Sequence, residues 1–271
     1  MVNKTVISEA IKKLNIENKP VCIHSSLKSF GYLEGGAQAL IEAFLDSGCT
    51  VMVPAFTHAF DIFPPENLRP ARNSSNYSSL KEEDYNKTRI YTTDCNDISI
   101  KDMGIVPYTL VNMDCRKRGY HPIHSFAAVG KLADILIKGQ SPEDVYAPFR
   151  ELRKYNGFIL LMGVDLRRAT IIHYAEQLAG RKLFIRWAYN LQGKPMAVSV
   201  GGCSRGFGNF ENMVRPIEKT ITVGESPWRC FSINELLDIC TKAIIENPHI
   251  THCGNQNCVR CDDAVQGGPI W

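Results

Sequence analysis

The chain has 271 residues, 44% of them hydrophobic and 22% charged, so it is long enough to bury a core in one domain. Its 31 basic and 28 acidic residues nearly balance, which leaves no basic field for nucleic acid. No apolar stretch approaches the roughly 20 residues of a membrane span, no apolar signal segment is visible, and ten cysteines suit a reducing compartment. We therefore expect a cytoplasmic protein without a membrane or nucleic-acid partner.

The first third of the chain predicts an α/β domain. Residues 5–14 are expected to form a short helix, and 20–27 an apolar strand that runs into a polar turn. Helical spacing follows over 34–48, and a second buried strand over 49–56. This order predicts a mainly parallel or mixed sheet with helices on both faces, a three-layer α/β/α arrangement.

The pattern fails from 57 to 102, a segment that contains Pro64, Pro65 and Pro70. A loop of that length in a compact domain is usually functional or disordered. We interpret it as an inserted loop region within a single domain spanning 1–271.

Regular patterns resume after the insertion. The expected elements are a helix after Pro107 within 103–113, a helix beginning near His124 and reaching 139, a strand over 158–164, a helix from about Arg168, short strands within 181–223, and a final helix over 232–248 capped by Ser232.

His173 and Glu176 follow the apolar strand and lie three residues apart, so they share one face of the expected helix. A helix N-terminus disfavours an imidazolium, which leaves the ring neutral and able to accept a proton. Glu176 is expected to hold the ring's tautomer or to bind a cationic substrate. Asp165 ends the strand, where open α/β sheets place ligands. The spacing alone also fits an ordinary surface pair.

Two polar segments are further candidates. His121, His124 and Ser125 precede small residues at an expected helix start, where N–H groups can hold a carbonyl oxygen or a phosphate. The residues 24–27, with the sequence HSSL, offer hydroxyls and N–H donors at the end of the first strand. A capped helix with incidental histidines explains the first segment equally well.

The sequence GCSRG at 202–206 matches the G-x-S-x-G elbow of serine hydrolases, with Ser204 as nucleophile. The match is weak, because no HGGG-type oxyanion motif is present and His249 and His252 lie in a polar tail. A glycine-rich turn is the simpler interpretation.

The C-terminal tail, 249–271, is rich in soft metal ligands. A C-x4-C-x2-C spacing with a nearby histidine supplies enough ligands for a structural zinc, although free or redox-labile thiols are the alternative. The candidate ligands are Cys253, Cys258, Cys261 and either His249 or His252.

Seven motifs appear in order between about residues 20 and 265: HSSL, GGAQALIEAF, VMVPAFTH, DMGIVP, HPIHSFAAVG, GVDLRRATIIHYAE and GGCSRGF. Together they resemble the aminoglycoside 3-N-acetyltransferases, a family associated with antibiotic resistance. The resemblance implies an α/β/α enzyme that transfers acetyl from acetyl-CoA, its co-substrate, to an amine. The acceptor implied is the 3-amino group of an aminoglycoside; another amine is the alternative.

The resemblance also implies roles for particular residues. His173 is the expected base, assisted by Glu176, with no covalent enzyme intermediate; Cys22 is a rival nucleophile for a two-step route. The oxyanion is expected to meet donors near Ser125. The expected acetyl-CoA contacts are His24, Ser25, Ser26, Leu27, His124, Ser125 and Phe126. The expected acceptor contacts are Asp165, Glu176 and Thr57, with the 57–102 region covering that site. Apart from the resemblance, the loop carboxylates Glu82, Glu83, Asp84, Asp94 and Asp97 could add negative potential there, although ordinary solvated surface charge is the simpler interpretation. No metal is expected at the catalytic site, and the chain is expected to be a monomer or homodimer.

Overall fold

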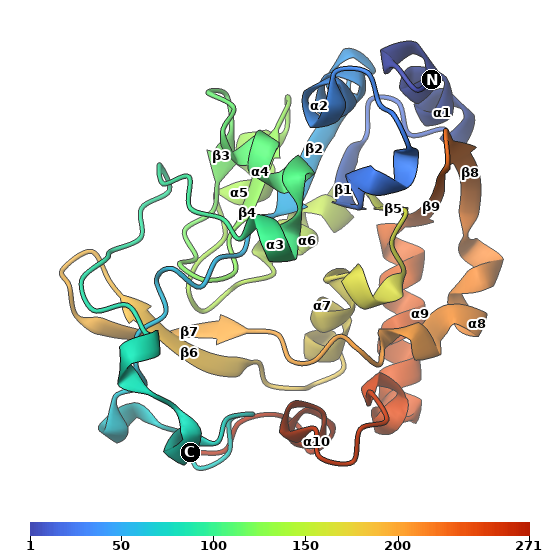
Figure 1. The fold of residues 1–271 in the computed structure, drawn as a ribbon. Helices are drawn as coiled ribbons and strands as arrows, with labels where there is room; N and C mark the ends of the chain where they lie inside the picture. The colour runs from blue at the N-terminus through green and yellow to red at the C-terminus, as the bar shows by residue number, and fades with distance from the viewer.

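A computed structural model describes all residues, 1–271, and contains a mixed seven-stranded sheet and a separate two-stranded hairpin (Figure 1). The strands are β1 (Pro20–Ser25), β2 (Thr50–Pro54), β3 (Lys117–Arg118), β4 (Phe126–Val129), β5 (Phe158–Met162), β6 (Phe184–Tyr189), β7 (Pro195–Val200), β8 (Lys219–Val223) and β9 (Ser226–Ser232). The large sheet has the order β3-β4-β2-β1-β5-β9-β8, and β6 pairs with β7. β1 runs parallel to both β2 and β5, whereas the other pairs are antiparallel.

Ten α-helices and eight 3-10 turns connect these strands. The α-helices are α1 (Lys4–Leu14), α2 (Gly36–Asp46), α3 (Ile100–Met103), α4 (Ile105–Val111), α5 (Ala133–Ile137), α6 (Ala147–Lys154), α7 (Ile171–Leu178), α8 (Glu211–Val214), α9 (Ile233–Glu246) and α10 (Val259–Val265). The 3-10 turns are η1 (Leu27–Phe30), η2 (Glu66–Leu68), η3 (Tyr77–Ser79), η4 (Glu82–Asp84), η5 (Leu166–Arg168), η6 (Phe207–Phe210), η7 (Arg215–Ile217) and η8 (Pro248–Thr251).

Side chains along the central strands alternate between two hydrophobic cores, one on each face of the sheet. On β1, Val21 and Ile23 belong to the core that α1, α2 and α4 cover. Cys22, between them, belongs to the core that α5, α6, α7 and α9 cover. Because successive strand residues point to opposite faces, helices must cover both sides of the sheet. The expected three-layer α/β/α arrangement is confirmed.

The helix expected to begin near His124 is wrong. Residues 126–129 form β4, which pairs antiparallel with β2, and the helix α5 begins only at Ala133. Phe126 and Ala128 face one core while Ala127 and Val129 face the other, which is the two-residue period of a strand. The run is too short and too rich in alanine for its period to be recognised in the sequence.

Three further points about the helices and strands differ from the expectations. The helix expected from about Arg168 begins at Ile171, because Asp165 caps the separate turn η5 by accepting the N–H of Arg167 at 2.9 Å. Ser232 occupies the N-cap position of α9, but its side chain makes no capping hydrogen bond. Strand β9, which pairs with β5 and brings α9 onto the sheet, is absent from the expected elements.

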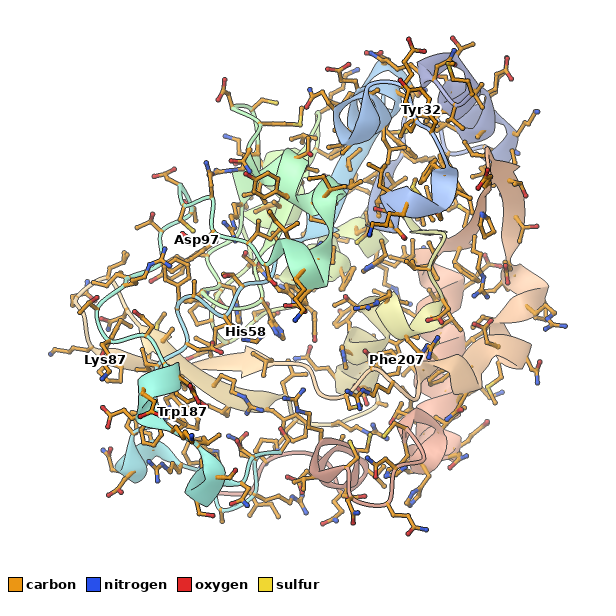
Figure 2. The ribbon with its side chains drawn as sticks, in the orientation of Figure 1. Tyr32, His58, Lys87, Asp97, Trp187 and Phe207 are labelled. Carbon is orange, nitrogen blue, oxygen red and sulfur yellow. The ribbon has the colours of Figure 1, made fainter.

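The 57–102 region contains only the turns η2, η3 and η4 and the beginning of α3, as its sequence predicted. It runs beside the β6–β7 hairpin, where Figure 2 marks His58 and Lys87 of the insertion and Trp187 of the hairpin. Asn73 fixes this contact, since its amide bonds the N–H and the C=O of Ile185 at 2.8 and 2.9 Å. No helix in the structure combines the length and apolar character needed to cross a membrane.

Candidate active site

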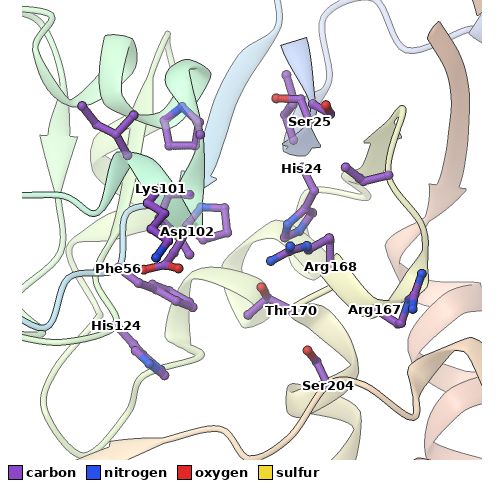
Figure 3. A pocket seen from close by; sticks show the side chains of 18 of the residues that line it. His24, Ser25, Phe56, Lys101, Asp102, His124, Arg167, Arg168, Thr170 and Ser204 are labelled. Atoms are coloured by element: carbon purple, nitrogen blue, oxygen red, sulfur yellow. The ribbon is translucent and has the colours of Figure 1, made fainter. Parts of the chain in front are cut away.

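A cavity of about 680 Å³ opens at the carboxyl ends of the three parallel strands (Figure 3). Ser25 ends β1, Pro54 ends β2 and Val164 follows β5, and all three line the cavity. β2 and β5 pair with β1 on opposite sides, so the connections from β1 lead to opposite sides of the sheet and the strand order reverses at β1. Such a switch point is where open α/β sheets bind ligands.

His173 reaches this cavity from α7 as part of a buried row of charged and polar groups. Its Nδ1 lies 2.7 Å from Oε2 of Glu176, and Oε1 of the same carboxylate lies 2.5 Å from Nη1 of Arg181. The three residues are only 7%, 6% and 8% exposed. Because Nδ1 is engaged by the carboxylate, Nε2 remains as the nitrogen that can exchange a proton with a ligand.

Arg181 is fixed by the C-terminal segment of the chain. Its Nη1 donates to the Thr251 hydroxyl at 2.8 Å, and its Nη2 donates to the carbonyl of Pro248. The turn η8 therefore holds Arg181, which holds Glu176, which in turn holds the ring of His173. This chain of contacts joins residues that are far apart in the sequence. The motif around His173 therefore did not predict the part played by Arg181.

Tyr146 lies against the same histidine, beside a glycine that permits close approach. A methyl group on Gly201 would lie 2.5 Å from the Tyr146 hydroxyl and 2.7 Å from Cγ of His173, so any side chain there would collide with both. The Tyr146 hydroxyl is buried without a hydrogen-bond partner, and the residue lines the cavity. Burial, and then the negative charge of Glu176, hold the pKa of Tyr146 well above its usual range, so the phenol keeps its proton.

Two other histidines line the cavity in neutral form. Burial, together with the nearby charge of Arg168, lowers the pKa of His24 to about 4. Burial also holds the pKa of His124 well below its usual range, and Phe56 stacks on its ring with centroids 4.2 Å apart. Cys22 lies behind His24 in the core, outside the cavity lining, and burial raises the pKa of its thiol, so a nucleophilic thiolate is disfavoured there.

The structure brings together most of the residues expected to contact acetyl-CoA. His24, Ser25, Ser26, Leu27 and His124 all line the cavity, whereas Ser125 and Phe126 do not.

Ser125 and Phe126 belong to the segment that was misread as a helix start. Phe126 is buried in the core on β4. The Ser125 hydroxyl donates to the carbonyl of Ala55 at 3.0 Å and accepts from Nε of Arg118 at 3.0 Å. Its bonds within the scaffold account for the Ser125 hydroxyl, whereas the hydroxyl of the cavity residue Tyr146 has no hydrogen-bond partner.

The three residues expected at the acceptor site lie outside the cavity lining. Asp165 forms an ion pair with Arg167, and the buried Thr57 hydroxyl accepts the N–H of Ala59 at 3.2 Å. Glu176 lies behind His173, with both oxygens engaged. None of the loop carboxylates lines the cavity either; they are Glu82, Glu83, Asp84, Asp94 and Asp97.

The cavity is lined by more positive than negative side chains. Lys28, Lys101, Arg167 and Arg168 line it, against a single carboxylate, that of Asp102. Figure 3 shows Lys101 and Asp102 facing Arg168 across the opening, with Arg167, which pairs with Asp165, farther away. The two arginines stand within one of the sequence motifs, where no role was expected for them. Such a lining suits an anionic ligand that carries phosphate groups.

Ser204 lines the cavity but does not have the setting of a hydrolase nucleophile. The strand β7 ends at Val200, four residues earlier, and the short turn η6 follows instead of a helix. The Ser204 hydroxyl makes no hydrogen bond to a histidine. His252, one proposed partner, bonds Asp262 through Nε2 at 3.1 Å. Phe207 of η6, labelled in Figure 2, instead packs edge-on against His173 with ring centroids 4.7 Å apart.

A family model described as aminoglycoside 3-N-acetyltransferase matches residues 22–244. This chain belongs to the aminoglycoside 3-N-acetyltransferase family. The cavity with His173 lies within the matched region, and membership makes the protein an acyltransferase, as the resemblance of its motifs implied. The family also removes the support for a serine hydrolase, because the GCSRG run is part of the matched sequence.

The proteins that resemble this chain share little of its sequence but most of its fold. The SPbeta prophage-derived aminoglycoside N(3')-acetyltransferase-like protein YokD of Bacillus subtilis is 28% identical over 90% of this chain and 93% of its own length. An aminoglycoside N(3)-acetyltransferase III of Salmonella is 28% identical, over 66% of this chain and 62% of that enzyme. The crystal structure of aminoglycoside acetyltransferase AAC(3)-IVa has a TM-score of 0.76 at 22% identity, covering 98% of this chain and 97% of its own.

Proposed function

We propose that this enzyme transfers the acetyl group of acetyl-CoA to the 3-amino group of an aminoglycoside in the cytoplasm, with His173 as general base. The observation that carries the proposal is the buried pair of His173 and Glu176, 2.7 Å apart, at a cavity formed by the carboxyl ends of parallel strands. Family membership supplies the reaction class. The ten free thiols support a reducing compartment.

Acetyl-CoA is supported as co-substrate by the cavity and by a related structure. AAC-IIIb, with a TM-score of 0.71 and 17% identity, was solved with CoASH. Here the polar turn after β1 and the cations Lys28, Arg167 and Arg168 all line one cavity. Phosphates and a pyrophosphate are recognised by such cations and by polar turns.

The chemistry needs a base because an ammonium group has no lone pair for attack, and the neutral amine that attacks must still lose one more proton. In the proposed step, the ammonium first releases one proton to solvent, and the neutral nitrogen then forms a bond to the thioester carbonyl carbon. As that bond forms, Nε2 of His173 takes the second proton from the nitrogen. The tetrahedral intermediate collapses by breaking the C–S bond, and the departing thiolate takes the proton from the imidazolium. The products are an amide and CoA with a free thiol, with no acyl-enzyme step.

Glu176 is proposed as a positioning residue and Tyr146 as the oxyanion donor. Both oxygens of Glu176 are engaged, so holding the Nδ1–H of His173 is favoured over binding the ammonium. The protonated, unpartnered hydroxyl of Tyr146 converges with His173 on Gly201. A preorganised donor of this kind contributes about 10²–10³-fold to acyl transfer.

The acceptor can be an aminoglycoside or a different amine. A related structure, AAC(3)-IVa with a histidine-to-alanine substitution, was solved with a gentamicin (TM-score 0.77, 22% identity), which supports an aminoglycoside. The single carboxylate Asp102 among four cations favours the alternative, an amine of lower charge. Covering of the acceptor by the 57–102 region remains a proposal; its last residues, from Ile100 onward, line the cavity.

An acceptor panel tests the proposed function. Loss of the thioester absorbance of acetyl-CoA is followed with aminoglycosides of different charge and with simple mono- and diamines, and the acetylated position is read by mass spectrometry and NMR. Turnover that requires an aminoglycoside and modifies its 3-amino group supports the proposal. Turnover only with low-charge amines replaces the acceptor, and no acetyl-CoA binding removes the proposal.

A further inference from the structure

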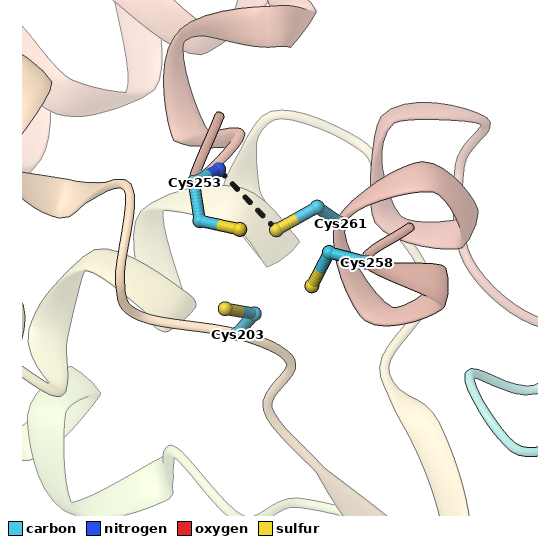
Figure 4. A group of neighbouring side chains, drawn as sticks. All are labelled: Cys203, Cys253, Cys258 and Cys261. Atoms are coloured by element: carbon cyan, nitrogen blue, oxygen red, sulfur yellow. Dashed lines mark hydrogen bonds between the residues drawn. The ribbon is translucent and has the colours of Figure 1, made fainter. Parts of the chain in front are cut away.

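Four cysteines from three segments converge beside the candidate active site (Figure 4). Cys203 lies in the loop after β7, Cys253 follows η8, and Cys258 and Cys261 lie at the start of α10. Their four Sγ atoms all lie within 4.8 Å of one another. We propose that this Cys203–Cys253–Cys258–Cys261 cluster binds a structural zinc ion that braces the His173–Glu176 pair.

The arrangement fits the geometry of a tetrahedral all-thiolate site. A Zn–S bond is about 2.3 Å, which separates the sulfurs of a regular tetrahedron by about 3.8 Å. The four sulfurs lie within 4.8 Å of one another, so each pair is at most about 1 Å beyond that value. The backbone N–H of Cys253 already points to Sγ of Cys261 at 3.4 Å, the kind of outer contact that stabilises a metal-bound thiolate.

The fourth ligand comes from a segment that the tail spacing could not indicate. A histidine was expected to complete the set, but both ring nitrogens of His252 are engaged: Nδ1 accepts the N–H of Gly254 at 3.1 Å, and Nε2 bonds Asp262. His249 is exposed at the surface. Cys203 fills the fourth position instead.

Burial as small hydrophobes does not account for these four residues. Cys22, Cys49, Cys230 and Cys240 are fully buried within the two cores, as thiols with a packing role are. Three members of the cluster are half-buried and the cluster belongs to neither core. Soft thiolates gathered at one point select zinc over harder cations.

The metal would join two segments that both touch the candidate active site. On one side, the loop of Cys203 begins with Gly201, which abuts His173, and contains the cavity residue Ser204. On the other side, Cys253 follows η8, whose Thr251 and Pro248 bind Arg181. A zinc ion therefore fixes both the loop that packs on the base and the segment that fixes its partner carboxylate.

The same site would also anchor the inserted loop through α10. The carboxylate of Asp263 accepts the backbone N–H of Ser74 at 2.6 Å, and Arg72 donates to the carbonyl of Gly268 at 2.8 Å. Removal of the metal is expected to loosen α10 and with it the insertion, while the central sheet keeps its cores.

Metal analysis of the full-length chain tests the proposal without reference to activity. The protein is purified under reducing conditions from zinc-supplemented cells, and zinc is measured by mass spectrometry. One zinc per chain is expected, lost on Cys203→Ser and retained by the control Cys115→Ser, which changes an exposed cysteine outside the cluster. Zinc equally abundant in both variants, or absent from the unmodified protein, overturns the proposal.

Two further measurements use the unmodified chain, so their results do not depend on whether the Cys203→Ser variant folds. Cobalt substitution of the unmodified chain is expected to give the charge-transfer and d–d bands of tetrahedral thiolate ligation. Thiol titration of the denatured, metal-free protein is expected to find all ten cysteines free. Absence of those bands, or a count four thiols lower that reports two disulfides in the cluster, contradicts a zinc site.

Discussion

The substitution Glu176→Gln tests how the carboxylate controls His173. In the native row, one oxygen of Glu176 accepts from Nδ1 of His173 and the other accepts from Arg181, which can only donate. A glutamine keeps the shape but has one oxygen and one NH₂ group. Its oxygen must face Arg181, because an NH₂ group there would meet a guanidinium, and its NH₂ group then faces Nδ1.

This orientation reverses the histidine tautomer. Nδ1 must accept the amide N–H, which leaves the proton on Nε2 and removes the lone pair that takes the proton of the amine. Loss of a correctly held base costs about 10²–10⁴-fold in acyl-transfer enzymes. We therefore expect kcat for Glu176→Gln to fall by at least about 10²-fold, close to the loss for His173→Ala.

A double variant separates the tautomer from the charge. In Glu176→Gln/Arg181→Met the amide oxygen is free to face Nδ1, and kcat should recover by roughly tenfold over the single glutamine variant. Rates are measured from loss of the acetyl-CoA thioester, and thermal unfolding of each variant checks the fold. An unchanged rate in Glu176→Gln, or a double variant no faster than the single one, would refute this reasoning.

The remaining predictions concern the cavity and its buried histidines. Tyr146→Phe should lower kcat by about 10²-fold with KM and melting temperature unchanged, because the hydroxyl has no partner in the resting structure; steady-state kinetics with an unchanged kcat would exclude the oxyanion role. Gly201→Ala should destabilise the fold by about 1–3 kcal/mol in urea unfolding, because its methyl group would overlap two buried side chains. Arg168→Ala should raise the KM for acetyl-CoA by about tenfold, the loss of one phosphate-binding cation, and an unchanged KM would place the phosphates elsewhere. Burial lowers the pKa of both His24 and His121 to about 4, below the unfolded value of 6.5, so the unfolded chain binds more protons between these values and stability must fall as pH drops from about 6.5 toward 4. Each histidine should cost about 2 kcal/mol between pH 7 and 5, and equal unfolding free energies at the two pH values would contradict their burial in neutral form.

Local sequence patterns were sufficient for the layers of the fold and for the His173–Glu176 pair. Apolar runs with turn signals indicated β1, β2 and β5, and an i, i+3 spacing on one helix does not depend on the rest of the fold. Strand β4 was misread because four small and apolar residues fit more than one period. Its misassignment removes one of the two grounds for expecting Ser125 at the cavity; the other was the resemblance to the family.

The remaining site residues depend on contacts between distant segments. Arg181 meets Glu176 only because η8 returns to it from the end of the chain, and Cys203 meets the tail cysteines across a loop that packs on α7. Tyr146 lies in a stretch with no recognisable motif, and its free hydroxyl becomes evident only when its surroundings are known. Spacing along the chain carries no information about such contacts.

The measurement that tests the central claim most directly is acetyl-CoA turnover by the unmodified enzyme, His173→Ala and the control His249→Ala, which removes an exposed histidine of the tail. We expect turnover that requires an amine acceptor, a fall of at least about 10²-fold for His173→Ala with its melting temperature preserved, and no change for His249→Ala. Full activity of His173→Ala would contradict the role of His173 as the base.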